Sequence, residues 1–218
     1  ERPPDWVVSA TGEPPEIYSL EVNGWVLRAA THAMSRHDVD LVYVTTTDYA
    51  MHTYAPGEPQ SQQHMTILDD AIGRLMEAHP DVTLLVTADH GMSPKRRMVD
   101  LAGALARYGI DAIQVPIIKD RYTAHHSNLG GCIFVYLDDP SQSREALKIL
   151  RGIDGVEEAL ERSEAATKYR LYFDRLGDII VNAESDAVFG DPSEVKMPPR
   201  LRSHASVHER TIPLLGHN

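Results

Sequence analysis

The sequence contains one cysteine, no long apolar run and fewer basic than acidic residues. Because Cys132 has no second cysteine to pair with, no internal disulfide can form, and a reducing, cytoplasmic compartment is the simpler expectation. No apolar stretch approaches the roughly 20 residues that a transmembrane helix needs. The N-terminal residues also lack the charged and apolar regions of a signal peptide. We therefore expect a soluble protein that does not bind a membrane.

The charge balance is acidic, with 21 lysines and arginines against 32 aspartates and glutamates, a formal net charge of −11. A protein that binds a nucleic-acid polymer needs a basic surface to displace the counterions of the phosphates, so we exclude that class. Any anionic ligand must instead be bound by a local group of residues. The 218 residues are 42% hydrophobic and 24% charged, which is typical of a globular chain with one large or two small domains.

The first half of the chain alternates between helix-like and strand-like segments. Prolines and glycines in residues 1–16 indicate an irregular linker. Apolar residues then recur at helical spacing over 17–36 and again over 65–76. A short β-branched run follows each of these helices, at 40–46 and at 82–87. This alternation predicts the α/β class, with a mostly parallel sheet flanked by helices and with ligand sites at the carboxyl ends of the strands.

The second half of the chain predicts a smaller, cap-like α+β subdomain over residues 98–198, whose sheet order the sequence does not reveal. Its expected elements are helices near Val99–Tyr108 and Arg144–Arg151 and strands near Ala112–Ile118, Cys132–Leu137 and Asp178–Val181. The acidic run over 157–164 is expected to be the solvated face of a helix. Residues 17–97 and 199–218 are then left to form the metal-binding α/β core.

Aspartate and histidine residues follow both predicted strands of this core. Asp48 and His52 are four residues apart just after the first strand, so on a helix they would share a face and could bind one metal ion. Asp89 and His90 come directly after the second strand, and Gly91 behind them would permit a tight backbone exit. The alternative for each pair is a helix-capping aspartate beside an ordinary histidine, and it weighs more for the first pair than for the second.

A late histidine, His204, could return to the same edge of the sheet, and His208 and His217 are rivals for this role. Two Asp/His pairs and one late histidine make five nitrogen and oxygen ligands of the type that hold two metal ions. Paired metal ions can clamp a phosphoryl or phosphonyl group and generate hydroxide at neutral pH. They would also explain how an acidic protein binds a dianion, because bound divalent cations supply the positive charge.

The order of these residues resembles the alkaline phosphatase superfamily, in the branch with nucleotide pyrophosphatase/phosphodiesterases and phosphonoacetate hydrolase. The segments that carry the resemblance are TTTDYAMHTYAPG, VTADHGMSPK, YTAHHSNLGG, DRLGDIIV and LRSHASVHERTIPLL, and their wording is most similar to phosphonoacetate hydrolase. The resemblance spans nearly the whole chain from Ile17 onward. It implies a two-zinc hydrolase of phosphonate catabolism, with an alkaline phosphatase-like core that is partial in this chain.

The resemblance also implies a role for each predicted ligand. Asp48, His52 and His204 resemble the three protein ligands of one zinc ion. Asp89 and His90 resemble two ligands of the other. The family completes this second site with an aspartate and a threonine nucleophile that come earlier in the chain, and neither has a matching position here, so the catalytic nucleophile is unknown. The chain thus resembles the C-terminal half of such an enzyme, and the missing initial methionine and proline-rich opening favour a fragment over a natural truncation.

For a complete enzyme the resemblance implies cleavage of the carbon–phosphorus bond of phosphonoacetate to acetate and phosphate, through attack by the threonine. Small anionic phosphonates or phosphate esters would be its ligands, whereas a homodimer and activity of the isolated chain are left open. Two alternatives remain. One is a nucleotide pyrophosphatase/phosphodiesterase of the same superfamily, and the other is a truncated relative that binds zinc without catalysis.

Three further groups of residues could bind the substrate or favour its approach. His125 and His126 lie in a segment that resembles the family, and Arg202 could contact an anionic substrate beside His204. The basic run Lys95–Arg97 would either favour the approach of anions or form ordinary solvated surface.

Overall fold

The computed structural model describes residues 2–118 and 127–218. It divides the chain into two compact units, the first made of Glu1–Thr87 with Pro213–Asn218 and the second of Ala88–Ile212. Within the described part of the chain, no helix has both the length and the apolar character needed to cross a membrane.

The bounds of these units differ from the domains expected from the sequence. The first break falls after Thr87 rather than after residue 97, and the second falls before Pro213 rather than before residue 199. The expected division into 17–97 with 199–218 and 98–198 stays a prediction.

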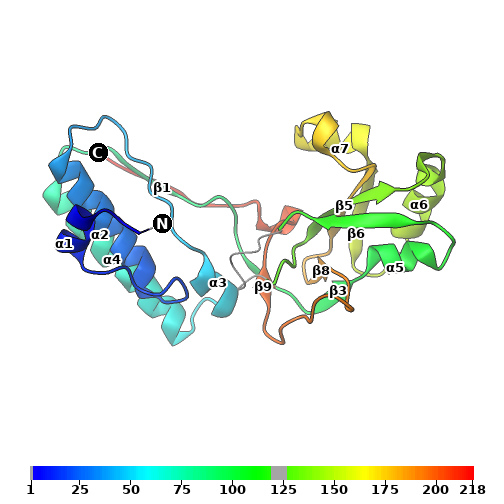
Figure 1. Ribbon diagram of the computed structural model, residues 1–218, viewed down its shortest axis with the longest axis horizontal. Coiled ribbons are helices and arrows are strands. Elements are labelled where there is room, and N and C mark those ends of the chain that lie inside the picture. The colour runs from blue at the N-terminus through cyan, green and yellow to red at the C-terminus, as the bar shows by residue number, and fades with distance from the viewer. Residues whose placement is uncertain (1, 119–126) are drawn as a thin grey trace. The chain divides into compact units, whose positions relative to one another are not determined.

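Helices dominate the first unit (Figure 1). Its elements are α1 (Asp5–Thr11), α2 (Glu21–Arg36), α3 (Tyr49–Thr53), α4 (Pro59–Ala78), β1 (Leu84–Thr87) and β10 (Leu214–His217). The helices predicted over 17–36 and 65–76 are confirmed as α2 and α4. The prediction of irregular structure over 1–16 is wrong for α1, which begins directly after Pro4, where the missing N–H of a proline leaves no helical hydrogen bond unmade.

Helices α2 and α4 pack closely against each other. Gly24 permits this approach, because a Cβ at this position would lie 2.6 Å from Cγ2 of Ile67 on α4. Trp25 is buried beside it, and its indole N–H donates a hydrogen bond of 3.0 Å to the carbonyl of Gly12. This bond ties the end of α1 to α2.

The strand predicted at 40–46 is not formed, and its apolar side chains are exposed, with Leu41 and Tyr43 each 88% accessible. A strand needs hydrogen bonds from a neighbouring strand, and none of the described residues pairs with this segment. The strand predicted at 82–87 is confirmed as β1, but it pairs antiparallel with β10. The expectation of a mostly parallel sheet is therefore wrong for the described residues, in which β3 and β8 form the one parallel strand pair.

The second unit is a mixed α/β unit built on a four-stranded antiparallel sheet in the order β4-β5-β7-β6. Its strands are β2 (Ser93–Pro94), β3 (Arg97–Val99), β4 (Ala112–Pro116), β5 (Cys132–Leu137), β6 (Val156–Glu161), β7 (Ile179–Ala183), β8 (Ala187–Phe189) and β9 (Arg202–Ser203). Its helices are α5 (Leu101–Ala106), α6 (Ser143–Leu150) and α7 (Arg162–Tyr169), with single turns η1 (Pro140–Gln142), η2 (Phe173–Arg175) and η3 (Val207–Glu209). The helices and strands predicted for 98–198 are confirmed as α5, α6, β4, β5 and β7.

Helices cover both faces of this sheet, with α5 and α6 on one side and α7 on the other (Figure 1). The larger core includes Leu101 of α5, Leu150 of α6 and Ile179 of β7, which are all fully buried. The acidic run over 157–164 was expected to be a helix face, but it forms most of β6 and the start of α7. Val156, Ala159 and Leu160 decide the outcome, because their burial on the sheet outweighs the local charge pattern.

Ile179→Ala should lower the free energy of unfolding by about 2–5 kcal/mol, because it leaves a cavity in the larger core. Ile113 on β4 provides the matched control, since its side chain is 62% exposed. Ile113→Ala should change the free energy by no more than about 0.5 kcal/mol. Urea unfolding of the two variants measures the difference, and equal losses would contradict this placement of the core.

Candidate metal centre

Asp48 and His52 come together at the start of helix α3 in the first unit. The carbonyl of Asp48 accepts hydrogen bonds from the backbone N–H groups of Met51 and His52, at 3.0 and 3.1 Å, which starts the helical turn. This turn brings the two side chains onto one face, where Nε2 of His52 lies 3.0 Å from Oδ2 of Asp48. The imidazole is buried and the carboxylate is partly exposed, so the pair presents a carboxylate edge to solvent.

A buried asparagine fixes the backbone immediately before Asp48. Oδ1 of Asn23 accepts from the backbone N–H of Thr47 at 2.9 Å, and its Nδ2 donates to the carbonyl of the same residue at 2.7 Å. Nδ2 also lies 2.9 Å from Nε2 of His64, and both side chains are almost fully buried. Burial lowers the pKa of His64, which favours the neutral imidazole with Nε2 as an acceptor.

Neither Asn23 nor His64 was among the residues selected from the sequence. Their signal was nevertheless present, because each is a polar residue on the buried face of an amphipathic helix, α2 or α4. A buried polar side chain needs hydrogen-bond partners. These partners lie 24 and 41 residues away from Asn23, so the sequence could not identify them.

The other three predicted ligands lie in the second unit. Oδ2 of Asp89 is 3.4 Å from Nε2 of His90, and Nδ1 of His90 lies 3.0 Å from the carbonyl of Gly91. The imidazole rings of His90 and His204 stack face to face, with centroids 3.6 Å apart and planes inclined by 6°. The structure thus brings together Asp89 with His90, and His90 with His204.

The loops that carry these histidines are held together by backbone contacts. β2 and β9 pair through Ser93 and Ser203, which joins the stretch after His90 to the stretch before His204. Gly91 donates its backbone N–H to the carbonyl of Glu209 at 2.7 Å. A Cβ at Gly91 would lie 3.3 Å from that carbonyl oxygen, so the small residue permits a close approach between two loops.

Beneath these loops lies a buried ion pair between Lys95 and Glu209. Nζ of Lys95 donates to Oε1 of Glu209 at 3.0 Å and to the carbonyl of Ser185 at 2.9 Å. The hydroxyl of Ser93 donates to the same carboxylate oxygen. The other oxygen, Oε2, accepts from the backbone N–H of Ser206 at 2.9 Å and from its hydroxyl at 2.6 Å. Every oxygen of this carboxylate is therefore engaged.

Two of the three residues in the basic run Lys95–Arg97 are neither solvated nor available to attract anions. Lys95 is buried, and Arg97 forms ion pairs with Asp154, Glu184 and Asp186. The expectation of solvated surface holds for the exposed Arg96. It is wrong for Lys95 and Arg97, because the carboxylates that pair with them come from distant parts of the sequence.

The remaining predicted residues have varied placements. Arg202 is buried and donates to the carbonyl of Met92 at 3.0 Å, while its contact with a substrate stays a prediction. His208 pairs with Glu157. His217 lies on β10 opposite Leu84. His125 and His126 lie outside the described residues.

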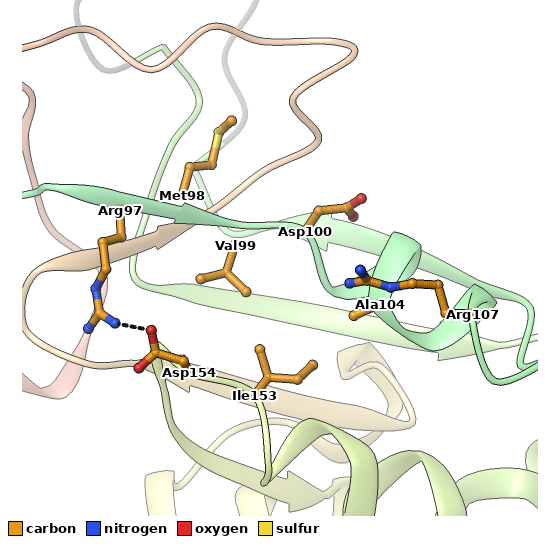
Figure 2. A pocket seen from close by; sticks show the side chains of 8 residues that line it. All are labelled: Arg97, Met98, Val99, Asp100, Ala104, Arg107, Ile153 and Asp154. Carbon is orange, nitrogen blue, oxygen red and sulfur yellow. Dashed lines mark hydrogen bonds and ion pairs between the residues drawn. The ribbon is translucent and has the colours of Figure 1, made fainter.

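A hollow of about 530 Å³ lies elsewhere in the second unit, between β3, α5 and residues 153–154 (Figure 2). Val99 and Ile153 form part of its wall, and Arg97 points to Asp154 across it. None of the predicted ligands lines this hollow. Arg97 is paired with carboxylates, and two aspartates, Asp100 and Asp154, line the hollow together with Arg107, so the charges of its lining are balanced.

The donor pairs suit a zinc ion by their chemistry and spacing. Zinc binds carboxylate oxygen and imidazole nitrogen at about 2.0–2.2 Å, so two ligands of a tetrahedral ion lie about 3.3 Å apart. The donor atoms of Asp48 and His52 are separated by 3.0 Å, and those of Asp89 and His90 by 3.4 Å. The grouping of His204 with Asp48 and His52 joins residues of the two units and stays a prediction.

Asp/His pairs on an α/β scaffold are typical of metal-dependent hydrolases. The chain belongs to the type I phosphodiesterase/nucleotide pyrophosphatase family, whose model matches residues 6–208. This match confirms the resemblance to that branch of the alkaline phosphatase superfamily.

Solved structures give the same result. The chain is similar to the phosphonoacetate hydrolase from Sinorhizobium meliloti 1021 in its complexes with phosphonoformate and phosphonoacetate, with a TM-score of 0.87 to each and 30% and 31% identity. Each match covers 96% of this chain and 53% of that one. The chain therefore spans about half the length of these relatives, and the match confirms the alkaline phosphatase-like α/β class.

A more distant likeness extends to ectonucleotide pyrophosphatase/phosphodiesterase 5. The murine protein matches with a TM-score of 0.57 and 18% identity, over 78% of this chain and 44% of that one. The human protein matches with a TM-score of 0.59 and 16% identity, over 91% and 52%. At this identity the likeness shows the fold alone.

The acid sensitivity of the second unit should depend on Glu209. Burial alone would raise the pKa of this carboxyl, but hydrogen bonds from Ser206, Ser93 and Lys95 outweigh it and lower the pKa below the ordinary value of 4.5. The stabilisation is therefore complete above pH 4.5 and is lost as the pH falls through the lower, folded-state pKa. Urea unfolding at pH 7 and at pH 4 and below should show a smaller loss of stability for Glu209→Gln than for the wild type. The exposed Glu194→Gln provides the control, and an unchanged pH dependence in Glu209→Gln would contradict the assignment.

Proposed function

We propose that the chain supplies metal-ligating residues of a zinc-dependent hydrolase that cleaves the carbon–phosphorus bond of phosphonoacetate. The observation that carries the proposal is the presence of two close donor pairs, Asp48 with His52 and Asp89 with His90, in a chain that is 30% identical to a phosphonoacetate hydrolase. The ligands are those implied by the resemblance. Asp48, His52 and His204 would hold one zinc ion, and Asp89 and His90 would contribute to the second.

The surroundings of the first pair support this role. The side chain of His52 is fully buried, so its imidazole is held in one orientation and shielded from water. The two hydrogen bonds from the side chain of Asn23 fix the backbone of Thr47, which places Asp48 at the start of α3. Both features prepare the donor atoms for an ion before it binds, which reduces the entropy lost on binding.

The charge of the chain also supports a metal-dependent mode of substrate binding. The net charge of −11 opposes the approach of a phosphonate dianion. The chemistry that zinc supplies at these residues is Lewis-acid neutralisation of the phosphonate oxygens and lowering of the pKa of bound water. Arg202, two residues before His204, is proposed to contact the anionic substrate.

A second candidate function is hydrolysis of a nucleotide phosphodiester, as the name of the family suggests. The match to the family model is the observation that favours it, since the likeness to ectonucleotide pyrophosphatase/phosphodiesterase 5 concerns the fold alone. The two candidates require the same metal ligands and differ in the leaving group. Release of phosphate from phosphonoacetate supports the first, whereas release of a nucleoside monophosphate from a dinucleotide substrate without turnover of phosphonoacetate supports the second.

Zinc titration calorimetry of the 218-residue chain tests the ligand assignment. Asp48→Ala and His52→Ala should each abolish binding at one site, because each removes one of two donor atoms, Oδ2 of Asp48 and Nε2 of His52, that lie 3.0 Å apart. His208→Ala is the control, since this histidine pairs with Glu157, and it should bind zinc like the wild type. Zinc binding that is unchanged in the Asp48 and His52 variants would reject the assignment.

Activity is measured in a polypeptide that spans the full length of the phosphonoacetate hydrolase. There, Asp48→Ala and His204→Ala should abolish phosphate release from phosphonoacetate, whereas His208→Ala should retain it. Full activity of either ligand variant would show that the residue does not bind a catalytic metal.

A further inference from the structure

Glu209 connects the two loops that carry His90 and His204, through its carboxylate and through its backbone carbonyl. Its Oε2 is bonded to Ser206, two residues after His204. Its backbone carbonyl accepts from Gly91, the residue after His90. Its Oε1 accepts hydrogen bonds from Ser93 and Lys95, which follow His90 by three and five residues. One residue therefore contacts both loops within two residues of a predicted ligand.

The ion pair at this point is unusually buried. The side chain of Lys95 is 0% exposed and that of Glu209 is 2% exposed. Moving two charges out of water is costly, and a well-packed apolar pair would often give equal or greater stability. What a charged pair adds is direction, because each hydrogen bond to a carboxylate oxygen has a defined distance and angle. The arrangement is therefore suited to holding the loops in one geometry.

The geometry that results is the stack of His90 on His204. Two imidazoles with centroids 3.6 Å apart and planes inclined by 6° have little rotational freedom. His204 is further held through its carbonyl, which accepts from Gly131 at 2.8 Å. The next residue, Ala205, has a φ of 75°, which an alanine adopts only when its surroundings impose it. The bonds from Ser206 to Glu209 directly follow this strained residue.

We propose that Glu209, paired with Lys95, is a positioning residue that sets the orientation of His90 and His204 for metal binding. The inference rests on the proposed function, because it assumes that these histidines bind metal. Glu209 itself does not contact either imidazole; it acts on the backbone next to each of them. Partners beyond the ligands themselves commonly change metal affinity by about 10–100-fold when they are removed.

Glu209→Gln is the first test, because it keeps the size of the side chain and removes the charge. Its amide NH₂ cannot accept a hydrogen bond, so the variant loses the bond either from the ammonium of Lys95 or from the backbone N–H of Ser206. In the metal-free chain, the NMR signals of the His90 and His204 ring protons should carry the ring-current shift of the stack. In Glu209→Gln these signals should move toward the values of an unstacked histidine, with assignments taken from His90→Gln and His204→Gln.

The matched control is Asp178→Asn in the same unit. Asp178 is also a carboxylate bonded to a cation and to a backbone N–H, through Arg162 at 2.7 Å and Leu137 at 2.9 Å. It lies on neither histidine loop. This variant should lose stability without moving the histidine signals, which separates positioning from a general loss of stability.

Zinc titration is the second test and uses the same two variants. Glu209→Gln should bind zinc about 10–100-fold more weakly than the wild type at the site that includes His90 or His204, and Asp178→Asn should bind it with unchanged affinity. If Glu209→Gln does not fold, Ser206→Ala is used instead. It keeps the backbone bond to Glu209 and removes the hydroxyl, which bonds Glu209 and the backbone N–H of His208, and it should change both readouts in the same direction by a smaller amount.

The outcomes separate this inference from the proposed function. A folded Glu209→Gln whose histidine signals and zinc affinity equal those of the wild type would overturn the positioning role. A folded full-length polypeptide that binds no zinc and releases no phosphate from phosphonoacetate would overturn the proposed function instead. In that case the NMR comparison in the metal-free chain would still decide whether Glu209 orients the two histidines.

Discussion

In each unit, the predicted ligands depend on hydrogen bonds that a buried residue makes to the backbone beside them. The side chain of Asn23 forms hydrogen bonds with both the N–H and the C=O of Thr47, one residue before Asp48. The carboxylate of Glu209 accepts from the backbone N–H of Ser206, and its backbone carbonyl accepts from Gly91, so this residue contacts the chain just after His204 and just after His90. A backbone held in this way cannot shift without leaving a buried polar group unsatisfied. The ligand-bearing turns are therefore more rigid than their irregular structure suggests.

This rigidity matters because the ligand residues lie outside the regular strands. Asp48 precedes a helix of five residues, and His204 follows a strand of two residues. Neither element is long enough to fix a side chain by its own hydrogen bonds. The larger antiparallel sheet provides a packed core for the second unit. The loops are instead held by buried hydrogen bonds such as that between Ser206 and Glu209. Core and site are thus stabilised by different interactions.

The predicted metal ions would reconcile the acidic composition with the proposed substrate. Two of the basic side chains that were candidates for anion binding are already paired, since Lys95 is bonded to Glu209 and Arg97 to three carboxylates. The described hollow beside Arg97 shows the same neutralisation. A chain of this kind would bind a phosphonate through divalent cations held by aspartate and histidine. The likeness to a phosphonoacetate hydrolase, over about half of that protein's length, is consistent with a site in which metal ions supply the positive charge.

The sequence by itself determined the local elements and the donor pairs. Helical periodicity identified α2 and α4, and β-branched runs identified β4, β5 and β7, because these signals arise from neighbours along the chain. The spacing of Asp48 and His52 likewise predicted their convergence on one turn. Only the tertiary structure decided that 40–46 has no strand partner among the described residues, that β1 pairs with β10, and that Lys95 is buried against Glu209. These outcomes depend on residues more than a hundred positions apart, or on strand neighbours that the described chain does not provide, and no local pattern encodes such contacts.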